Sequence, residues 1–266
     1  MNDKFKNLLK LLDDENEQAA SQAMAELLQE NDPRLSRILR SLQETGNARL
    51  RRRIHQMQSA IIRRKARKLL AENLRENQLS LLEGIIRLHL LWFDNDTRAE
   101  VMRQWKEFIG ESANHRHDSL TDLLAFTEQK ITCSGFAKDE LNADNLCLGT
   151  ILEDGYAMDY MCCIIAKLLA ESWHIPCDIV CTESDFALLS GNMLHYPLRH
   201  WEAIPNFNFQ LHKWSVGELL SLLASSLFVC AVSTDSFRYI YTLGNCIFNE
   251  DKNLLLSLPY PYGNDR

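Results

Sequence analysis

The sequence predicts a predominantly helical α+β protein, and three observations indicate this fold class. Apolar residues recur at helical spacing through most of the N-terminal half of the chain, which is the pattern of amphipathic helices. From Met161 to Leu169 the apolar residues are too dense for a surface helix, so we expect this helix to lie in the core. Ile175-Pro176 ends it, and Cys177 to Cys181 then has the β-branched, apolar character of a short buried strand.

Length and composition are those of an ordinary globular protein. The chain has 266 residues, 46% hydrophobic and 24% charged, which allows one large domain or two small ones. A net charge of −7 argues against general affinity for nucleic acid, although it is compatible with a local basic patch. The opening segment soon turns polar, and no uninterrupted apolar run reaches the roughly 18 residues that span a bilayer. We therefore expect a cytoplasmic protein without a membrane segment.

The cysteines indicate a reduced protein. There are 8 in the chain, two of them adjacent at Cys162 and Cys163, and most lie in apolar runs. Such thiols behave as small hydrophobic side chains, whereas a disulfide framework is typical of short secreted chains. We expect buried, unpaired cysteines.

The histidines do not predict a metal or cofactor site. His115 and His117 alternate in a polar loop, without Cys, Asp or Glu nearby at the spacing that ligands require. His195 and His200 flank Pro197, so they cannot share one helical face. No metal and no cofactor are expected.

Residues 1–78 are expected to form an N-terminal helical segment. Two short helices precede a turn at Asn31-Asp32-Pro33, a third helix ends at Gly46-Asn47, and a long helix runs from Ala48 to Leu74. An acidic or Asn-rich turn followed by leucine pairs recurs at about forty residues, near the period of HEAT and armadillo repeats. With at most two copies of the pattern, a plain helical bundle is a nearly equal alternative.

The long helix is strongly basic between Arg49 and Lys68. Such a face could contact phosphate groups, but aromatic residues for base stacking are absent from it. The helix also has an apolar stripe, formed by Leu50, Ile54, Met57, Ile61 and Ile62, so the charges fit a solvated opposite face. An acidic protein, or the acidic first helices of this chain, is a better partner for it than nucleic acid.

Residues 79–266 are expected to form the second domain. Ser80 and Glu83 have the form of a capping box, Asp94 to Thr97 is a loop before the next helix, and 110–118 is a polar loop. Another helix covers Leu120 to Ile131, and a turn follows at Cys133 to Phe136. Toward the end, Ser215 caps a helix that spans Trp214 to Val232, and 237–258 is expected to be helical.

Several short motifs of this second domain fall in one order and spacing: Leu81-Leu82-Glu83-Gly84, Gly135-Phe136, Asn145-Leu146, Ile151-Leu152-Glu153, Ile175-Pro176 and Asp185-Phe186-Ala187-Leu188. Together they resemble the SirB-type bacterial branch of the transglutaminase-like superfamily, over roughly Leu79 to Leu188. Each motif is loose, and their joint spacing carries the resemblance. It implies a papain-like α+β core in which a small antiparallel sheet packs on a central helix.

The resemblance also implies where catalytic residues would lie. In the superfamily's enzymes a Cys at the start of the central helix attacks an acyl carbon, a His on the next strand takes its proton, and an Asp or Asn orients the His. In this chain the matching positions are Asp159, Asp185 and the neighbourhood of Asn206. A carboxylate that is already ionised at neutral pH does not replace an imidazole. The catalytic positions are therefore degenerate.

A working nucleophile at Cys162 or Cys163 is the alternative, with His174, His195 or His200 as its base. A reactive thiol needs a cationic setting or a helix N-terminus, whereas these two lie inside the apolar run MCCIIAKLLA. Buried packing is the better interpretation of both. The candidate cleft thus consists of Asp159, Cys162, Cys163, Asp185 and Asn206.

These observations favour a non-catalytic transglutaminase-like protein, a pseudoenzyme, that binds a protein or peptide. An active cysteine hydrolase or acyltransferase that uses Cys162 or Cys163 is the first alternative. A basic-helix adaptor that binds nucleic acid or an acidic protein is the second, and it depends only on the stretch from Arg49 to Lys68.

Overall fold

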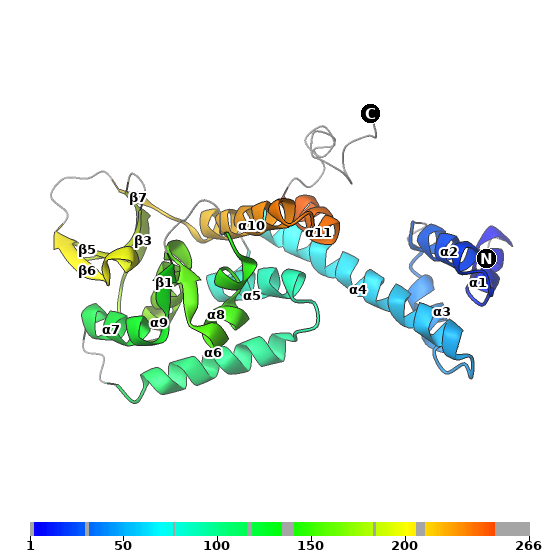
Figure 1. The fold of residues 1–266 in the computed structure, drawn as a ribbon, viewed down its shortest axis with the longest axis horizontal. Coiled ribbons are helices and arrows are strands. Elements are labelled where there is room, and N and C mark those ends of the chain that lie inside the picture. The colour runs from blue at the N-terminus through cyan, green and yellow to red at the C-terminus, as the bar shows by residue number, and fades with distance from the viewer. Residues whose placement is uncertain are drawn as a thin grey trace. The chain divides into compact units, whose positions relative to one another are not determined.

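The computed structural model describes residues 3–29, 32–76, 78–115, 119–134, 141–182, 185–205 and 211–247. In these ranges the protein is mostly helical and has a small five-stranded antiparallel sheet (Figure 1), which confirms the α+β class. The chain divides into two compact units, Met1–Leu69 and Leu70–Arg266. The sequence places the boundary slightly later, after residue 78.

The first unit is a set of short helices around one apolar core. It contains α1 (Asp3–Leu11), α2 (Glu17–Gln29), α3 (Leu35–Leu42) and the first part of α4 (Ala48–Arg75). The core residues come from the predicted apolar stripes: Phe5, Leu8, Leu12, Ala23, Leu27, Leu35, Leu39, Ile54 and Met57. Burial of these side chains supplies the driving force for the unit.

Two residues of α4 differ from the prediction of a charged face opposite an apolar stripe. Arg53 is buried, because it shares a helix face with Met57 one turn later and donates Nη1 to the carbonyls of Leu12 (2.8 Å) and Asp14 (2.7 Å). Its Nη2 lies 3.1 Å from the carboxylate of Glu17. Ile62, expected in the apolar stripe, is exposed. Arg53 therefore satisfies two carbonyls of the segment that connects α1 to α2.

After the end of α4, the second unit contains three capped helices: α5 (Leu81–Trp92), α6 (Arg98–Ser112) and α7 (Leu120–Lys130). Thr97 and Ser119 form complete capping boxes before α6 and α7. The box predicted at Ser80 is only half formed. The Ser80 hydroxyl accepts the N–H of Glu83, but the Glu83 carboxylate accepts from Arg87 (2.9 Å) and Arg98 instead.

A short parallel strand pair follows, where the sequence predicts a turn at Cys133. The pair consists of β1 (Thr132–Ser134) and β2 (Tyr156–Met158), and α8 (Leu148–Asp154) lies between them in the chain. The expectation of a turn from Cys133 is wrong, because the strand depends on pairing with a distant segment. Gly155 joins α8 to β2 at φ +74°, and a Cβ atom there would lie 2.9 Å from the Lys130 carbonyl oxygen, so the position requires glycine.

Helix α9 (Asp159–Ser172) is the centre of the second unit. Every residue from Asp159 to Ala170 except Lys167 is buried, which confirms the predicted core helix. It ends before Ile175-Pro176 as expected, with Trp173 as its C-cap. Contacts from α9 reach β2, β3, β4 and α7, so the helix fixes the strands that follow it.

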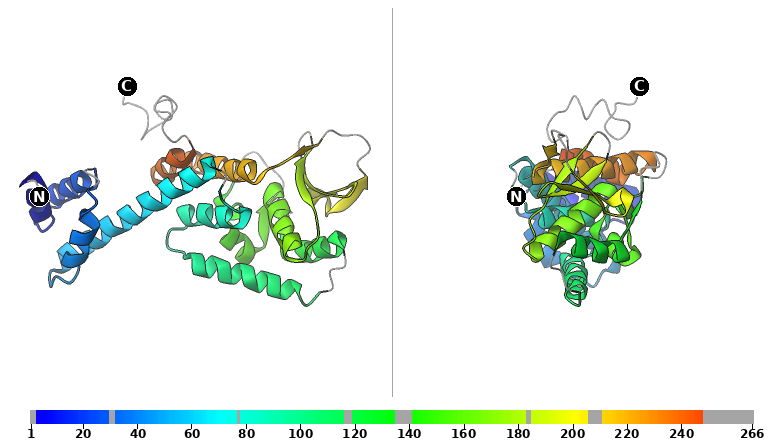
Figure 2. Two further views of the ribbon diagram at one scale, coloured as in Figure 1. Left: turned by 180° about the vertical axis from the view of Figure 1, so that it is seen from behind. Right: turned by 90° about the vertical axis from the view of Figure 1, so that its left-hand side faces the viewer.

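The five-stranded sheet has the order β6-β5-β4-β3-β7, and all its neighbours are antiparallel. Its strands are β3 (Asp178–Cys181), β4 (Phe186–Ser190), β5 (Met193–Tyr196), β6 (Glu202–Pro205) and β7 (His212–Lys213). The strand predicted after Ile175-Pro176 is β3. Within the second unit the sheet lies at one end and α11 at the other (Figure 2).

Two apolar helices complete the second unit, α10 (Val216–Ser233) and α11 (Phe237–Ile247). Ser215 caps α10 in a full capping box with Glu218, which confirms the predicted start of this helix. In the described part of the chain α10 is the one helix long and apolar enough to cross a membrane, and half of it is buried inside the protein. Its buried leucines belong to the main core, as predicted. The helix expected to reach residue 258 is described only to Ile247.

Candidate functional site

Asp159 begins the central helix and is almost fully buried, with 3% of its surface exposed. The side chain of the N-cap residue Met158 makes no hydrogen bond to the helix. The side chain of Asp159 accepts a backbone N–H of the first turn instead. Its carboxylate accepts the N–H of Tyr160 at 2.7 Å and the N–H of Phe186 at the start of β4. One side chain therefore satisfies the first turn of α9 and joins it to the sheet.

Asp185 immediately precedes β4 and lies next to Asp159. Burial and, to a lesser degree, the nearby charge of Asp185 raise the pKa of Asp159 above its ordinary value. Asp185 also faces Arg199, whose Nη2 lies 3.7 Å from its carboxylate oxygen. The structure thus brings the two carboxylates of the predicted cleft together and adds a cation that sequence reasoning missed.

The antiparallel hairpin explains why Arg199 reaches Asp185. Because Leu188 pairs with His195 in the β4–β5 register, the residues after Tyr196 lie beside the start of β4. The segment that follows β5, Pro197–Arg199, therefore adjoins Asp185. Asn206, the predicted third position, lies outside the described residues, as do His117 and Gly135-Phe136.

Cys162 and Cys163 are both enclosed by the core. Cys162 is 1% exposed, and its Sγ donates to the carbonyl of Ala157 at 3.7 Å. A hydrogen bond with the Cys133 thiol, followed by burial, raises the pKa of Cys162 well above its ordinary value. Burial does the same to the pKa of Cys163. Neither thiol has the lowered pKa that a nucleophile requires.

The three candidate base histidines are not gathered at these thiols. His174 follows the last turn of α9, about 18 Å along the helix from Cys162 at 1.5 Å per residue. His200 is exposed and lies 2.7 Å from the Glu128 carboxylate. His195 is buried on β5, where it hydrogen-bonds the backbone of Trp201, and burial lowers its pKa. No Cys–His pair is formed among the described residues just named.

The structure reveals one contact between a buried histidine and a half-exposed aspartate that the sequence did not suggest. His89 of α5 lies with Nε2 2.8 Å from the Asp96 carboxylate, and its Nδ1 accepts the N–H of Gly149 at 3.3 Å. Burial lowers the pKa of His89, against the opposing influence of Asp96. Because the lone pair of Nδ1 is used by Gly149, the imidazole is not available as a general base. It joins α5 to the start of α8.

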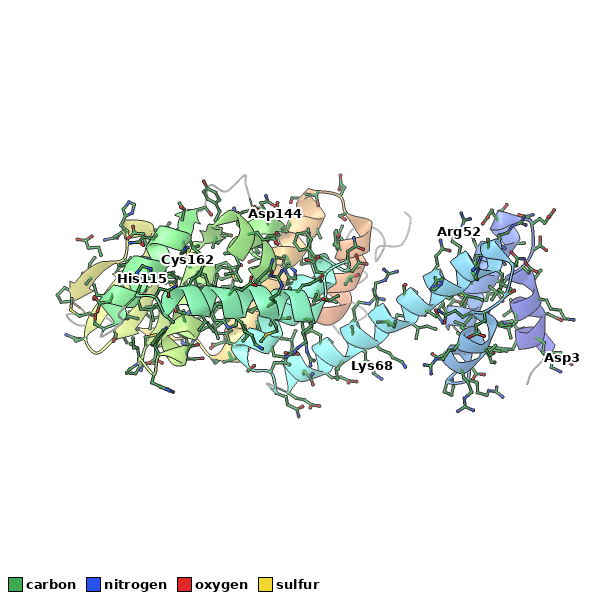
Figure 3. The ribbon with its side chains drawn as sticks, turned by 90° about the horizontal axis from the view of Figure 1, so that it is seen from below. Asp3, Arg52, Lys68, His115, Asp144 and Cys162 are labelled. Atoms are coloured by element: carbon green, nitrogen blue, oxygen red, sulfur yellow. The ribbon has the colours of Figure 1, made fainter. Side chains whose placement is uncertain are left out.

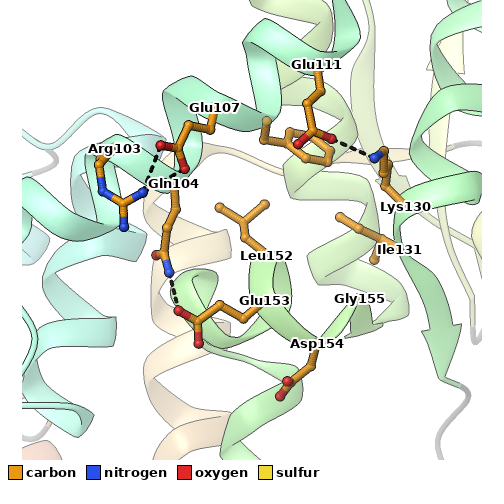
Figure 4. Close-up of a pocket in the computed structure, with 11 residues that line it drawn as sticks. Arg103, Gln104, Glu107, Glu111, Lys130, Ile131, Leu152, Glu153, Asp154 and Gly155 are labelled. Carbon is orange, nitrogen blue, oxygen red and sulfur yellow. Dashed lines mark hydrogen bonds and ion pairs between the residues drawn. The ribbon is translucent and has the colours of Figure 1, made fainter.

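A groove of about 510 Å³ lies between α6 and α8 (Figure 4), and Asp159 is not among the residues that line it. Its lining is mostly charged: Arg103, Gln104, Glu107, Phe108, Glu111, Lys130, Ile131, Leu152, Glu153, Asp154 and Gly155. Many of these groups pair with one another, as Arg103 does with Glu107 (2.8 Å) and Lys130 with Glu111 (2.6 Å). The groove meets the beginning of β2, whereas Asp159 follows its end, so the two places are separate.

The basic helix α4 forms ion pairs inside its own unit. Arg49 and Arg52 pair with Glu15 and Glu17 of the acidic N-terminal segment, in addition to Arg53. Figure 3 labels Arg52 and Lys68 on this helix. The expectation that the acidic first helices would neutralise part of the helix is therefore met at its N-terminal end.

No three His, Cys, Asp or Glu side chains in the described ranges come together in a way that could hold a metal ion. Besides Arg199, sequence reasoning missed Cys181, which adjoins both Asp159 and Asp185, and Cys133, which touches Cys162. Their positions follow from the pairing of the strands, which the sequence alone does not give. The chain matches no family model, no curated protein and no solved structure.

We expect Asp159→Asn to raise the free energy of unfolding at pH 7. The folded-state pKa of Asp159 is raised, chiefly by burial, so folding disfavours the ionised form of this carboxyl. An Asn oxygen still accepts the two backbone N–H groups. The wild-type carboxyl gains stability as it takes up a proton, so the advantage of Asn should shrink as the pH falls through that raised pKa.

Urea unfolding between pH 7 and pH 4 measures this difference, with Asp178→Asn as the control. Asp178 forms an exposed ion pair with Lys213 on the same sheet, and removing it should change stability little. A D159N protein that is less stable at pH 7 would show that the charge on the carboxylate strengthens its hydrogen bonds more than burial weakens it.

Proposed function

We propose that this chain is a non-catalytic protein of the transglutaminase-like type, with a HEAT-like helical segment before it, and that it binds a protein or peptide. The observation that carries the proposal is the use of Asp159. Where the resemblance expects a nucleophile, a buried carboxylate accepts backbone N–H groups from two elements. A group committed to holding the fold in this way is not a reacting group.

The neighbouring charges support a binding role. Asp185 and Arg199 are both accessible, with 29% and 52% of their side chains exposed, and their ion pair is loose at 3.7 Å. Such a pair can exchange its internal contact for contacts with a polar or charged side chain of a partner. We place the peptide-binding surface at these two residues, beside the start of α9.

The active-enzyme alternative has less support. It requires a reactive Cys162 or Cys163, but both thiols are buried and have raised pKa values. It also requires an imidazole, and the position that the resemblance assigns to that histidine is Asp185. The second alternative, a basic-helix adaptor, stays a prediction from the charge of α4 alone.

A selection from a random peptide library displayed on phage tests the proposal, with the full chain as bait in reducing buffer. Peptides that are enriched are then synthesised with a fluorescent label, and their affinity is measured by anisotropy. We expect binding to weaken about tenfold or more for Asp185→Asn and Arg199→Gln, which is a loss of about 1.4 kcal/mol. Asp178→Asn, which removes one charge from an ion pair at the other end of β3 and β4, is the matched control and should bind as wild type.

Two outcomes would contradict the proposal. Failure to enrich any peptide would show that Asp185 and Arg199 do not form a peptide-binding surface. Equal affinity of the wild type and the three variants would show the same. Cleavage of a bound peptide, or an acyl adduct on Cys162 or Cys163 in the mass spectrum of the intact protein, would place the cysteine hydrolase first.

A further inference from the structure

Two cysteines from distant parts of the chain meet beside the start of α9. Cys133 is the middle residue of β1 and pairs with Ala157 of β2 in the parallel register. Cys162 lies on the first turns of α9 (labelled in Figure 3), and its Sγ donates to the carbonyl of that same Ala157 at 3.7 Å. The Cys133 thiol is also the neighbour that contributes most to raising the pKa of Cys162. Both cysteines therefore contact Ala157, Cys133 through strand pairing and Cys162 through its thiol.

The two thiols differ in their access to solvent. Cys162 is enclosed by the core, whereas Cys133 is only half-buried and packs at its margin. Cys163 follows Cys162 directly, yet successive residues of a helix point about 100° apart, since one turn takes 3.6 residues. Cys163 is fully buried, and no hydrogen bond joins it to Cys133 in the structure. The pair is thus one accessible and one enclosed thiol in contact.

We propose that Cys133 and Cys162 form a reversible intramolecular disulfide when the protein meets a low-molecular-weight disulfide. The Cys133 thiolate attacks one sulfur of the small disulfide, which releases one small thiolate and leaves a mixed disulfide on Cys133. The Cys162 sulfur, after giving its proton to the released thiolate, attacks the Cys133 sulfur and expels the second small thiolate, which takes a proton from water. The protein loses two hydrogens, and one small disulfide becomes two thiols.

The geometry favours this bond. A disulfide needs Cα atoms roughly 4.4–6.8 Å apart, and both cysteines adjoin Ala157, Cys133 as its strand partner and Cys162 through its thiol. The bond would join β1 to the first turns of the helix that begins with Asp159. Oxidation would thereby hold the strand against the helix next to the binding surface proposed above, but the disulfide does not depend on that function.

The test is a redox titration of the full chain with reduced and oxidised glutathione. After acid quenching and alkylation, trypsin releases residues 131–138, which contain Cys133 alone, and residues 139–167, which contain Cys147, Cys162 and Cys163. We expect mass spectrometry to find these two peptides joined, two hydrogen masses lighter than their sum. The joined peptide should appear as the oxidised fraction rises and disappear on reduction.

Variants decide which thiols are joined. Cys133→Ser and Cys162→Ala should reduce the joined peptide to background, and Cys163→Ala, which removes the adjacent buried thiol, should leave its yield unchanged. Circular dichroism confirms that each variant is folded, and alanine avoids placing a hydroxyl in the core. The proposal is overturned if only a glutathione adduct forms on Cys133, if no joined peptide forms in fully oxidised buffer, or if it persists in C162A.

Discussion

Replacing Ile165 with alanine is expected to lower the free energy of unfolding by about 2–5 kcal/mol. Ile165 lies in the middle of α9 and is fully enclosed by the main core of the second unit. The change removes apolar contact area and leaves a cavity, because the strands and helices around α9 restrict its collapse. Urea unfolding followed by circular dichroism, analysed for the transition of the second unit, measures the loss.

Val229→Ala is the matched control for this prediction. Val229 also lies on an apolar helix, α10, but 54% of its surface is exposed, so its truncation should cost less than about 0.5 kcal/mol. If I165A cost no more than V229A, α9 would not be the central helix of the core. The arrangement of Asp159 against β4 would then lose its support as well.

Replacing Gly149 with alanine is expected to destabilise the protein by about 1–3 kcal/mol. A Cβ atom at this position would lie 2.6 Å from Cε1 of His89, closer than two carbon atoms approach. The ring cannot move away freely, because Nε2 contacts Asp96 and Nδ1 accepts the Gly149 N–H. The new methyl group must break the contact between α5 and α8 or shift α8.

A second glycine provides a control of opposite sign. Gly110 lies inside α6, and a Cβ atom added there meets nothing within 4 Å. Gly110→Ala should therefore stabilise the protein by about 0.5–1 kcal/mol, since alanine favours the helix. Thermal unfolding compares the two variants. Equal and small effects of G149A and G110A would mean that the His89 ring is not held in place.

The sequence predicts the helices of this protein better than it predicts the contacts between them. The density of apolar residues predicts α9. The capping residue Ser215, followed by apolar residues at helical spacing, predicts α10. These features are local and follow from periodicity and capping alone. The strand β1 was missed, because three residues around Cys133 become a strand only by pairing with residues 156–158.

The same distinction holds for the site. The order of motifs led to Asp159 and Asp185, and the structure places them together. Arg199 was missed because its approach to Asp185 follows from the register of β4 and β5, not from any motif. His89 and Gly149 are 60 residues apart in the chain, and no pattern in either segment predicts their hydrogen bond. Buried Arg53 was assigned to a solvated face for a similar reason, since its partners are the carbonyls of another turn.

The hydrogen bonds of Asp159 also restrict which residues this position tolerates. Its carboxylate accepts the N–H of Tyr160 and the N–H of Phe186, so one side chain completes both the start of α9 and the start of β4. A cysteine at this position is a poor acceptor and would leave two enclosed N–H groups without a good partner, at a cost of about 1–3 kcal/mol each. A mutation of Asp159 to cysteine would therefore weaken the fold. A variant that carries a thiol at this position would need another hydrogen-bond acceptor for the first turn of α9.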